Sequence, residues 1–208
     1  MLLLGVVLPG LAAAEDEGRK VHVIEQRPFI QRLRVELTPK YGYTINEVLF
    51  DYHQVGGDLR FHITEEWAIA GSFSWYFPAT TSAFEDVEST FDTFPEKRFV
   101  RWYAGGEVSW APVYGKFILF GSWTVPWNAW LSAGGGVTLT GVDGIHPTGT
   151  VGIGTRLFLT PWLTMEFELK DHIYSENFKA GDSIMNNFVV HAGFGFWFPV
   201  GWTYEFAK

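Results

Sequence analysis

The chain has 208 residues, of which 47% are apolar and 18% aromatic, and it contains no cysteine. This composition excludes a disordered chain, disulfide bonds, thiolate metal sites and cysteine nucleophiles. A formal net charge of −8 gives no indication of nucleic-acid binding. The mean hydropathy of +0.06 is high for a soluble domain, yet the sequence lacks the run of about 18 apolar residues that a membrane-spanning helix needs. A transmembrane β-barrel reconciles these properties, because only alternate residues of its strands must be apolar.

The start of the chain has the pattern of a secretory signal peptide. Leucine and valine dominate Leu2–Leu11, and Ala12–Ala14 supplies the small residues of a cleavage site. A buried N-terminal helix is the alternative interpretation. We expect a signal peptide over 1–14, a periplasmic segment over 15–30 and the folded barrel over 31–208.

Apolar and polar residues then alternate with a period of two in eight segments, and helical periodicity is scarce. In one of them Trp67, Ile69, Phe73 and Trp75 share a face that opposes alanines and serines. This alternation predicts an all-β fold, an eight-stranded antiparallel transmembrane β-barrel. The expected strands lie within residues 32–37, 55–63, 67–75, 100–110, 127–138, 151–159, 163–170 and 188–198.

The connections between these strands differ in length at the two ends of the predicted barrel. Short turns at the periplasmic end and longer external loops are typical of outer-membrane barrels. The segment Lys116–Trp123 is apolar on both faces, so we expect it at the membrane interface, and two further strands there would give ten. The expected periplasmic turns lie near 64–66, 111–125 and 160–162, and the external loops near 44–53, 77–99, 141–148 and 172–187.

Aromatic residues gather near the ends of the expected strands. Two aromatic clusters separated by aliphatic positions fit the two interfaces of a membrane. They disfavour a soluble, lipocalin-like barrel, which would turn its apolar residues inward. The predicted aromatic belts contain Trp67, Trp75, Trp102, Trp110, Trp127 and Trp162.

The polar face of the strands carries arginines, carboxylates and glycines, with Lys170 as its expected lysine. A guanidinium group satisfies several acceptors at once, so this composition suits a narrow, desolvated interior. Arginine–carboxylate pairs can fill an eight-stranded lumen, and the alternative is that the same residues line a pore for ions or small solutes. The expected interior network contains Arg32, Arg34, Glu36, Asp58, Arg60, His62, Arg101, Glu107, Arg156, Glu166, Glu168 and His191.

The sequence predicts neither catalysis nor a cofactor nor a metal site. A nucleophilic serine needs a histidine that an acid orients, and His172 with Ser175 has only Asp171 nearby. The glycines of Gly134–Gly136 and Gly152–Gly154 lie in strands with no helix after them, so they do not predict nucleotide binding. A lipid hydrolase is therefore the weakest of the alternatives.

Two segments are candidates for contacts with partners. The loop 77–99 mixes acids with phenylalanines, which favours contact with another envelope protein, or with cations among lipopolysaccharide, over a plain solvated loop. The segment 21–30 is the second candidate. The residues expected to make the loop contact are Phe84, Glu85, Asp86, Phe91 and Phe94.

Short motifs between Val21 and Pro199 resemble those of outer-membrane β-barrel proteins of myxobacteria and related δ-proteobacteria, which are similar in architecture to small OmpA-, OmpX- and OmpW-like barrels. The chain departs from this family at Val125–Asn128, where a His-x-Asp-like pair is expected. It also continues past Phe206, whereas a terminal phenylalanine is the usual assembly signal. The motifs are Glu36–Pro39, Tyr41–Tyr43, Phe61–Glu65, Ala111–Phe117, Gly134–Gly136, Gly152–Arg156, Glu168–Asp171, Tyr174, Asn186–Asn187 and Phe198–Pro199.

The resemblance implies a bacterial outer-membrane protein in contact with lipid and lipopolysaccharide. Some members of that family are associated with envelope-spanning assemblies such as gliding machinery. Together with the interior charges, this predicts a structural or scaffold barrel, a component of such an assembly, with a plugged lumen. A narrow channel for ions or small solutes is the alternative function.

Overall fold

A computed structural model of the protein describes residues 29–47, 50–81, 99–119, 123–141, 144–178 and 181–200. The expected signal peptide over 1–14, most of the N-terminal segment 15–30 and most of the loop 77–99 lie outside the described residues. The same holds for the five residues predicted to make the loop contact, Phe84, Glu85, Asp86, Phe91 and Phe94.

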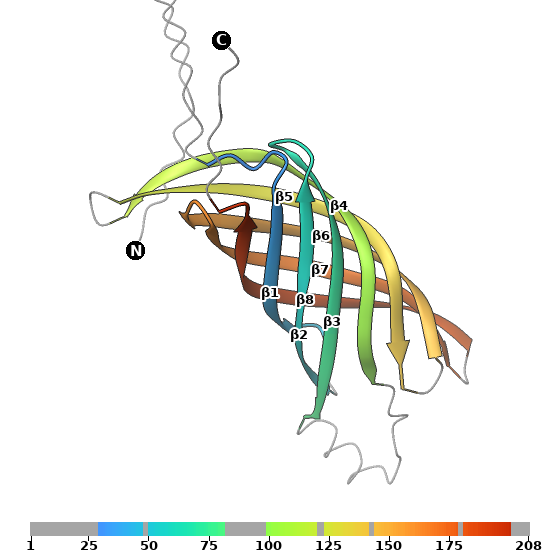
Figure 1. Ribbon diagram of the computed structural model, residues 1–208. Helices are drawn as coiled ribbons and strands as arrows, with labels where there is room; N and C mark the ends of the chain where they lie inside the picture. Colours follow the sequence, from blue (N-terminus) through green and yellow to red (C-terminus); the bar gives the residue numbers. More distant parts are fainter. Residues whose placement is uncertain are drawn as a thin grey trace, which may run out of the picture.

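Eight antiparallel strands close into a barrel, each pairing with the next in sequence and the last with the first (Figure 1). The prediction of an eight-stranded antiparallel β-barrel is confirmed, and the described residues form no ninth or tenth strand. In the same residues, no helix has the length and apolarity to cross a bilayer. The strands are β1 (Val35–Thr44), β2 (Phe50–His62), β3 (Trp67–Thr80), β4 (Val100–Leu119), β5 (Trp123–Thr140), β6 (Gly144–Thr160), β7 (Leu163–Phe178) and β8 (Gly181–Phe198).

The alternation in the sequence becomes an inside and an outside of opposite polarity. In β1, Glu36 and Thr38 are fully buried in the lumen, whereas Leu37 and Tyr41 are 47% and 49% exposed on the outer wall. Successive side chains of a strand point to opposite faces, so every strand that closes the barrel contributes to both surfaces. The polar residues lie inside and the apolar residues outside, the reverse of a soluble barrel.

Strand β4 departs from strict alternation at its first residues. The register with β5 shifts between Val100 and Trp102, which marks a β-bulge. Because a bulge adds a residue to one strand, it inverts the direction of the side chains beyond it. Val100 is therefore buried and Arg101 is exposed, so the predicted interior position of Arg101 is wrong.

Arg32 is the second predicted interior residue that lies on the surface. The chain has not yet entered β1 at this point, and Leu33 adopts a left-handed backbone conformation with φ of 57°. The turn leaves Arg32 exposed, with its backbone N–H donating to Glu65 in the β2–β3 turn. Extending the period-two pattern back to residue 32 was wrong because the strand begins at Val35.

Three of the expected connections are mostly strand instead of turn or loop. The β4–β5, β5–β6 and β7–β8 hairpins continue through most of the expected connections 111–125, 141–148 and 172–187. In the β4–β5 hairpin the far part lies beyond the neighbouring strands, because β3 pairs with β4 only as far as Trp110 and β6 pairs with β5 only from Trp127. Residues outside the closed wall need not alternate between a polar lumen and an apolar outer face, so the period-two signal disappears there.

Candidate functional site

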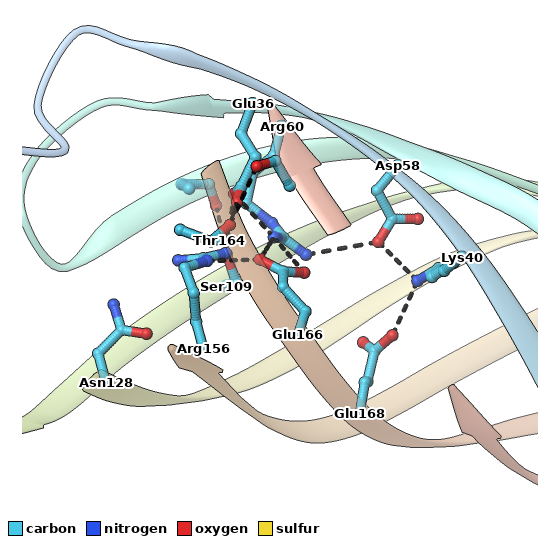
Figure 2. A network of polar contacts seen from close by, with 12 residues as sticks. Glu36, Lys40, Asp58, Arg60, Ser109, Asn128, Arg156, Thr164, Glu166 and Glu168 are labelled. Carbon is cyan, nitrogen blue, oxygen red and sulfur yellow. Dashed lines mark hydrogen bonds and ion pairs between the residues drawn. The ribbon is translucent and has the colours of Figure 1, made fainter. Parts of the chain in front are cut away.

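The barrel interior is the candidate site, and Arg60 of β2 lies at its centre. Its guanidinium group contacts Glu36 at 3.1 Å, Glu166 at 3.2 Å and Asp58 at 3.4 Å (Figure 2). The Arg60 side chain is only 1% exposed. Three strands, β1, β2 and β7, are thereby connected through one buried cation.

A second arginine joins the same carboxylates from β6. The Arg156 guanidinium lies 2.8 Å from the Glu36 carboxylate, and its Nε donates to Glu166. Both guanidinium groups also lie near the buried ring of Trp130, with Arg156 Cζ 4.8 Å and Arg60 Cζ 5.3 Å from the ring centroid. A desolvated aromatic ring attracts such cations, so Trp130 stabilises both arginines through cation–π contacts.

Two lysines form the adjacent layer. Lys40 Nζ lies 2.6 Å from Asp58 and 2.8 Å from Glu168, and Lys170 Nζ lies 2.8 Å from Glu107 and 3.1 Å from Glu168. The sequence analysis missed Lys40, although its spacing from Glu36 places it on the same face of β1. The expected strand over 32–37 ended before Lys40, whereas β1 continues to Thr44.

The resulting ion network contains four cations and five carboxylates, and none of these side chains is more than 6% exposed. Taking a charge out of water costs several kcal/mol, so each group needs the partners that the network supplies. Its members are Lys40, Arg60, Arg156 and Lys170 with Glu36, Asp58, Glu107, Glu166 and Glu168.

An aromatic cluster closes the lumen at the end where β1 begins. Phe29 packs against Phe158 and Trp197, with ring centroids 4.2 Å and 4.9 Å apart. Arg34 lies over the same rings and donates to the carbonyl oxygens of Pro161 and Pro199 at 2.8 Å and 2.9 Å. Arg34 therefore belongs to this closure, and its guanidinium group donates to backbone carbonyl groups.

A second cluster occupies the opposite end of the lumen. It is rich in tyrosine, and its members come from four strands, β2, β3, β4 and β7. His172 lies directly beneath it, with its ring 4.6 Å from that of Tyr103. The charged layers thus lie between two aromatic layers. The buried cluster contains Phe50, Tyr52, Tyr76, Val100, Tyr103 and Tyr174.

The predicted histidines lie within the ion network. His62 Nε2 lies 3.0 Å from the Glu36 carboxylate, and His191 Nδ1 lies 3.6 Å from Glu168. Among the described residues, no group of three His, Asp or Glu side chains has the geometry of a metal site. The structure thus places all of the predicted interior residues in the lumen or at its mouth, except Arg32 and Arg101.

The outer wall carries the predicted tryptophans. Trp67 and Trp110 are register partners on β3 and β4 and stack with ring centroids 5.9 Å apart, and Trp75 pairs with Trp102 toward the other end. Trp162 is 42% exposed in the β6–β7 turn. Trp127 lies on the outer face of β5.

Two other tryptophans, Trp130 and Trp197, point into the lumen. The period-two pattern could have identified both, because Trp130 alternates with Ala129 and Leu131 on β5 and Trp197 with Phe196 on β8. Tryptophan in this protein is therefore not only a residue of the outer belts.

The height of the outer apolar wall matches a membrane. Trp67 and Phe77 lie ten residues apart in β3, which is about 33 Å along a strand. A strand tilt of about 40° shortens this to about 25 Å along the barrel axis, the height of the apolar band of outer-membrane barrels. Between the belts the wall is aliphatic and roughly half-exposed, as at Leu59, Ile69, Val108, Leu131 and Ile153.

No protein-family model and no curated protein matches the sequence. A de novo designed transmembrane β-barrel aligns with 80% of this chain and 96% of its own, at 13% identity and a TM-score of 0.44. Ail, the attachment invasion locus protein of Yersinia pestis, aligns over 80% and 99%, at 11% identity and a TM-score of 0.42. Neisserial surface protein A aligns over 79% and 94%, at 10% identity and a TM-score of 0.39. With TM-scores below 0.5, these similar structures give no indication of function. The function must be inferred from the surfaces of this barrel itself.

Replacing Arg60 with methionine tests the ion network. The variant keeps the apolar stem but leaves Glu36, Asp58 and Glu166 without their shared cation, so we expect the free energy of unfolding to fall by about 3–5 kcal/mol. Urea titration of the barrel in lipid vesicles, followed by tryptophan fluorescence, measures it. Arg101→Met is the matched control because Arg101 is exposed, and it should change the stability by less than about 0.5 kcal/mol. Equal effects of the two substitutions would contradict the network.

Proposed function

We propose that this protein is an integral barrel of the bacterial outer membrane with a structural or scaffold role, and that its lumen passes no solute. The observation that carries the proposal is the inverted polarity of the barrel. Its outer wall is apolar between two tryptophan belts, and its lumen holds a buried ion network closed by aromatic clusters.

The membrane placement is supported by the outer wall. Leu59, Ile153 and Val108 are 58%, 54% and 48% exposed at the middle of the barrel. A wall of this extent would be an aggregation surface in water, and it is stable only against hydrocarbon. A closed barrel also leaves no unpaired strand edge in the bilayer.

The outer membrane is the location that suits such a barrel in bacteria, and the predicted signal peptide over 1–14 would export the chain. The resemblance to barrel proteins of myxobacteria, and to their envelope-spanning assemblies, supports a scaffold role. Contact with lipid and lipopolysaccharide follows from the same location. Neither a cofactor nor catalysis enters this proposal.

The ion network supports a plugged lumen over a narrow channel. Lys40 of β1 reaches Glu168 of β7 at 2.8 Å, and Lys170 of β7 reaches Glu107 of β4 at 2.8 Å. Both pairs join strands that are not neighbours in the barrel, so a solute could pass only if they separated. Separation would leave buried charges unpaired, at a cost of several kcal/mol.

The membrane placement is tested by extraction. We expect the protein to remain with bacterial membranes after alkaline carbonate washing, because its apolar wall contacts hydrocarbon. Detergent should solubilise it, and the folded barrel should migrate differently from the boiled chain on a denaturing gel. Release into the carbonate supernatant as a folded protein would contradict a membrane barrel.

The plugged lumen is tested by electrical recording. We expect purified barrel in planar bilayers to show no unitary current steps between −100 and +100 mV. A potential of 100 mV supplies about 2.3 kcal/mol per charge, which is less than the cost of separating the ion pairs. Arg60→Met serves as the comparison, since it weakens the plug. Regular unitary steps from the unaltered protein would favour the channel alternative.

The partner contact is tested by deletion of the loop. Replacing residues 82–98 with a short Gly/Ser linker removes Phe84, Glu85, Asp86, Phe91 and Phe94 while leaving β3 and β4 complete. We expect crosslinked envelope partners to be lost from pull-downs of this variant, because aromatic residues commonly dominate such contacts. Gel mobility must show an assembled barrel, and an unchanged set of partners would exclude the loop as the contact.

A further inference from the structure

The ladder between β1 and β8, which closes the barrel, is interrupted within the wall. Strand β1 pairs with β8 as far as Leu37 and again from Lys40, and the register is the same on both sides. Thr38 and Pro39 between them have no ladder partner in β8. The interruptions of the β4–β5 and β6–β7 ladders come with a shift of register, as at a β-bulge. The interruption between β1 and β8 therefore has another cause.

Pro39 explains this interruption, because proline has no backbone N–H to donate. Ile45, just after β1, donates its backbone N–H to the Phe188 carbonyl of β8. Successive residues of a strand direct their N–H groups to alternate edges, and residues 39 and 45 are an even number apart. The position of Pro39 thus also faces β8, and the ladder that closes the barrel lacks a hydrogen bond there.

The lumen side of β8 has no side chain that could hold β1 at this point. The two inward positions beside the interruption are Gly193 and Gly195. An added Cβ at Gly193 would lie 2.8 Å from Lys40 Cβ. At Gly195 it would collide with the carboxylate of Glu36. The side chains of β1 therefore pass directly over β8.

Bridges from β1 to the strands beyond β8 hold this seam instead. Lys40 Nζ lies 2.8 Å from the Glu168 carboxylate of β7. Glu36 accepts a hydrogen bond of 3.2 Å from the Thr164 hydroxyl of β7, and it lies 2.8 Å from Arg156 of β6. Each of these contacts crosses the seam on the lumen side without a contribution from β8.

The outer wall is hollowed over the same part of the seam. An apolar furrow of about 410 Å³ is lined there by Pro39, Ala192 and Phe194, among others. The wall is thus thin at the interruption, with a furrow outside, glycines inside and a missing hydrogen bond between them. In addition, every other neighbouring pair in the barrel is consecutive in the chain, so a connecting segment limits its separation.

We propose that the β1–β8 seam is a latch in the barrel wall. Around Pro39 the two strands separate more readily than neighbouring strands elsewhere in the wall, and the bridges from Lys40 and Glu36 keep them closed. Loss of the bridges opens the seam and exposes the backbone edges of β1 and β8, and re-formation of the bridges closes it. The inference concerns the wall itself and does not depend on the scaffold role.

Amide hydrogen exchange tests the latch, because it measures local opening. Magnetic resonance of the barrel in lipid nanodiscs follows Leu37 and Tyr41, whose N–H groups point to β8. Their register partners Leu59 and Val55, whose N–H groups point to β3, are the reference. We expect the two seam amides to exchange at least about tenfold faster than the reference. Pro39→Val supplies the missing N–H and should slow exchange at the seam by about fivefold, the net effect of one hydrogen bond.

Two lysine variants separate the bridges from a general loss of stability. Lys40→Met breaks the bridge to Glu168 and should speed exchange at the seam by more than about tenfold. Lys170→Met is the matched control, because Lys170 is equally buried but joins β7 to β4 through Glu107. We expect it to leave the ratio of seam to reference rates within about twofold of the unaltered protein. Gel mobility confirms that each variant is an assembled barrel.

Two results would overturn the latch. Equal exchange rates at the seam and at the reference amides of the unaltered protein would show that the seam is no weaker than the β2–β3 ladder. Equal acceleration of the seam by Lys40→Met and Lys170→Met would show that the bridge across the seam has no specific part in closing it.

Discussion

The structure depends on the burial of charge in a lumen too narrow for water to satisfy it. Arg60 and Arg156 share the carboxylates of Glu36 and Glu166, and Lys40 connects β1 to β7 through Glu168. In a soluble domain the interior would be apolar and such pairs would be replaceable. Here the apolar residues are required on the outside, so polar side chains must fill the inside and must satisfy one another there.

The other features of the lumen follow from this requirement. Glycines on the inner face leave room for large side chains, and at Gly105 an added Cβ would lie against the Tyr103 hydroxyl. The aromatic clusters around Phe29 and Tyr103 keep water from the ends of the network. Weaker shielding would lower the strength of every ion pair, because solvent screens charge. The same network that stabilises the barrel therefore also blocks it.

Much of this architecture could be predicted from period-two alternation alone. That pattern correctly indicated eight antiparallel strands and correctly assigned Glu36, Asp58, Arg60 and Glu166 to the polar face. It failed where the physical cause of alternation is absent. At Arg101 a bulge inverts the side chains, and the far part of the β4–β5 hairpin extends beyond its neighbouring strands.

By itself the sequence determined which residues share a face, because a strand places alternate side chains on opposite sides whatever surrounds it. It could not determine which charges meet. Lys40 and Glu168 are 128 residues apart, and only closure of β8 on β1 with its particular register brings them within 2.8 Å. The tertiary structure also decided the direction of Arg101 and the length of the β4–β5 hairpin. Both depend on the register between strands and on where the neighbouring strands stop pairing. These are properties of the assembled sheet and not of any one strand.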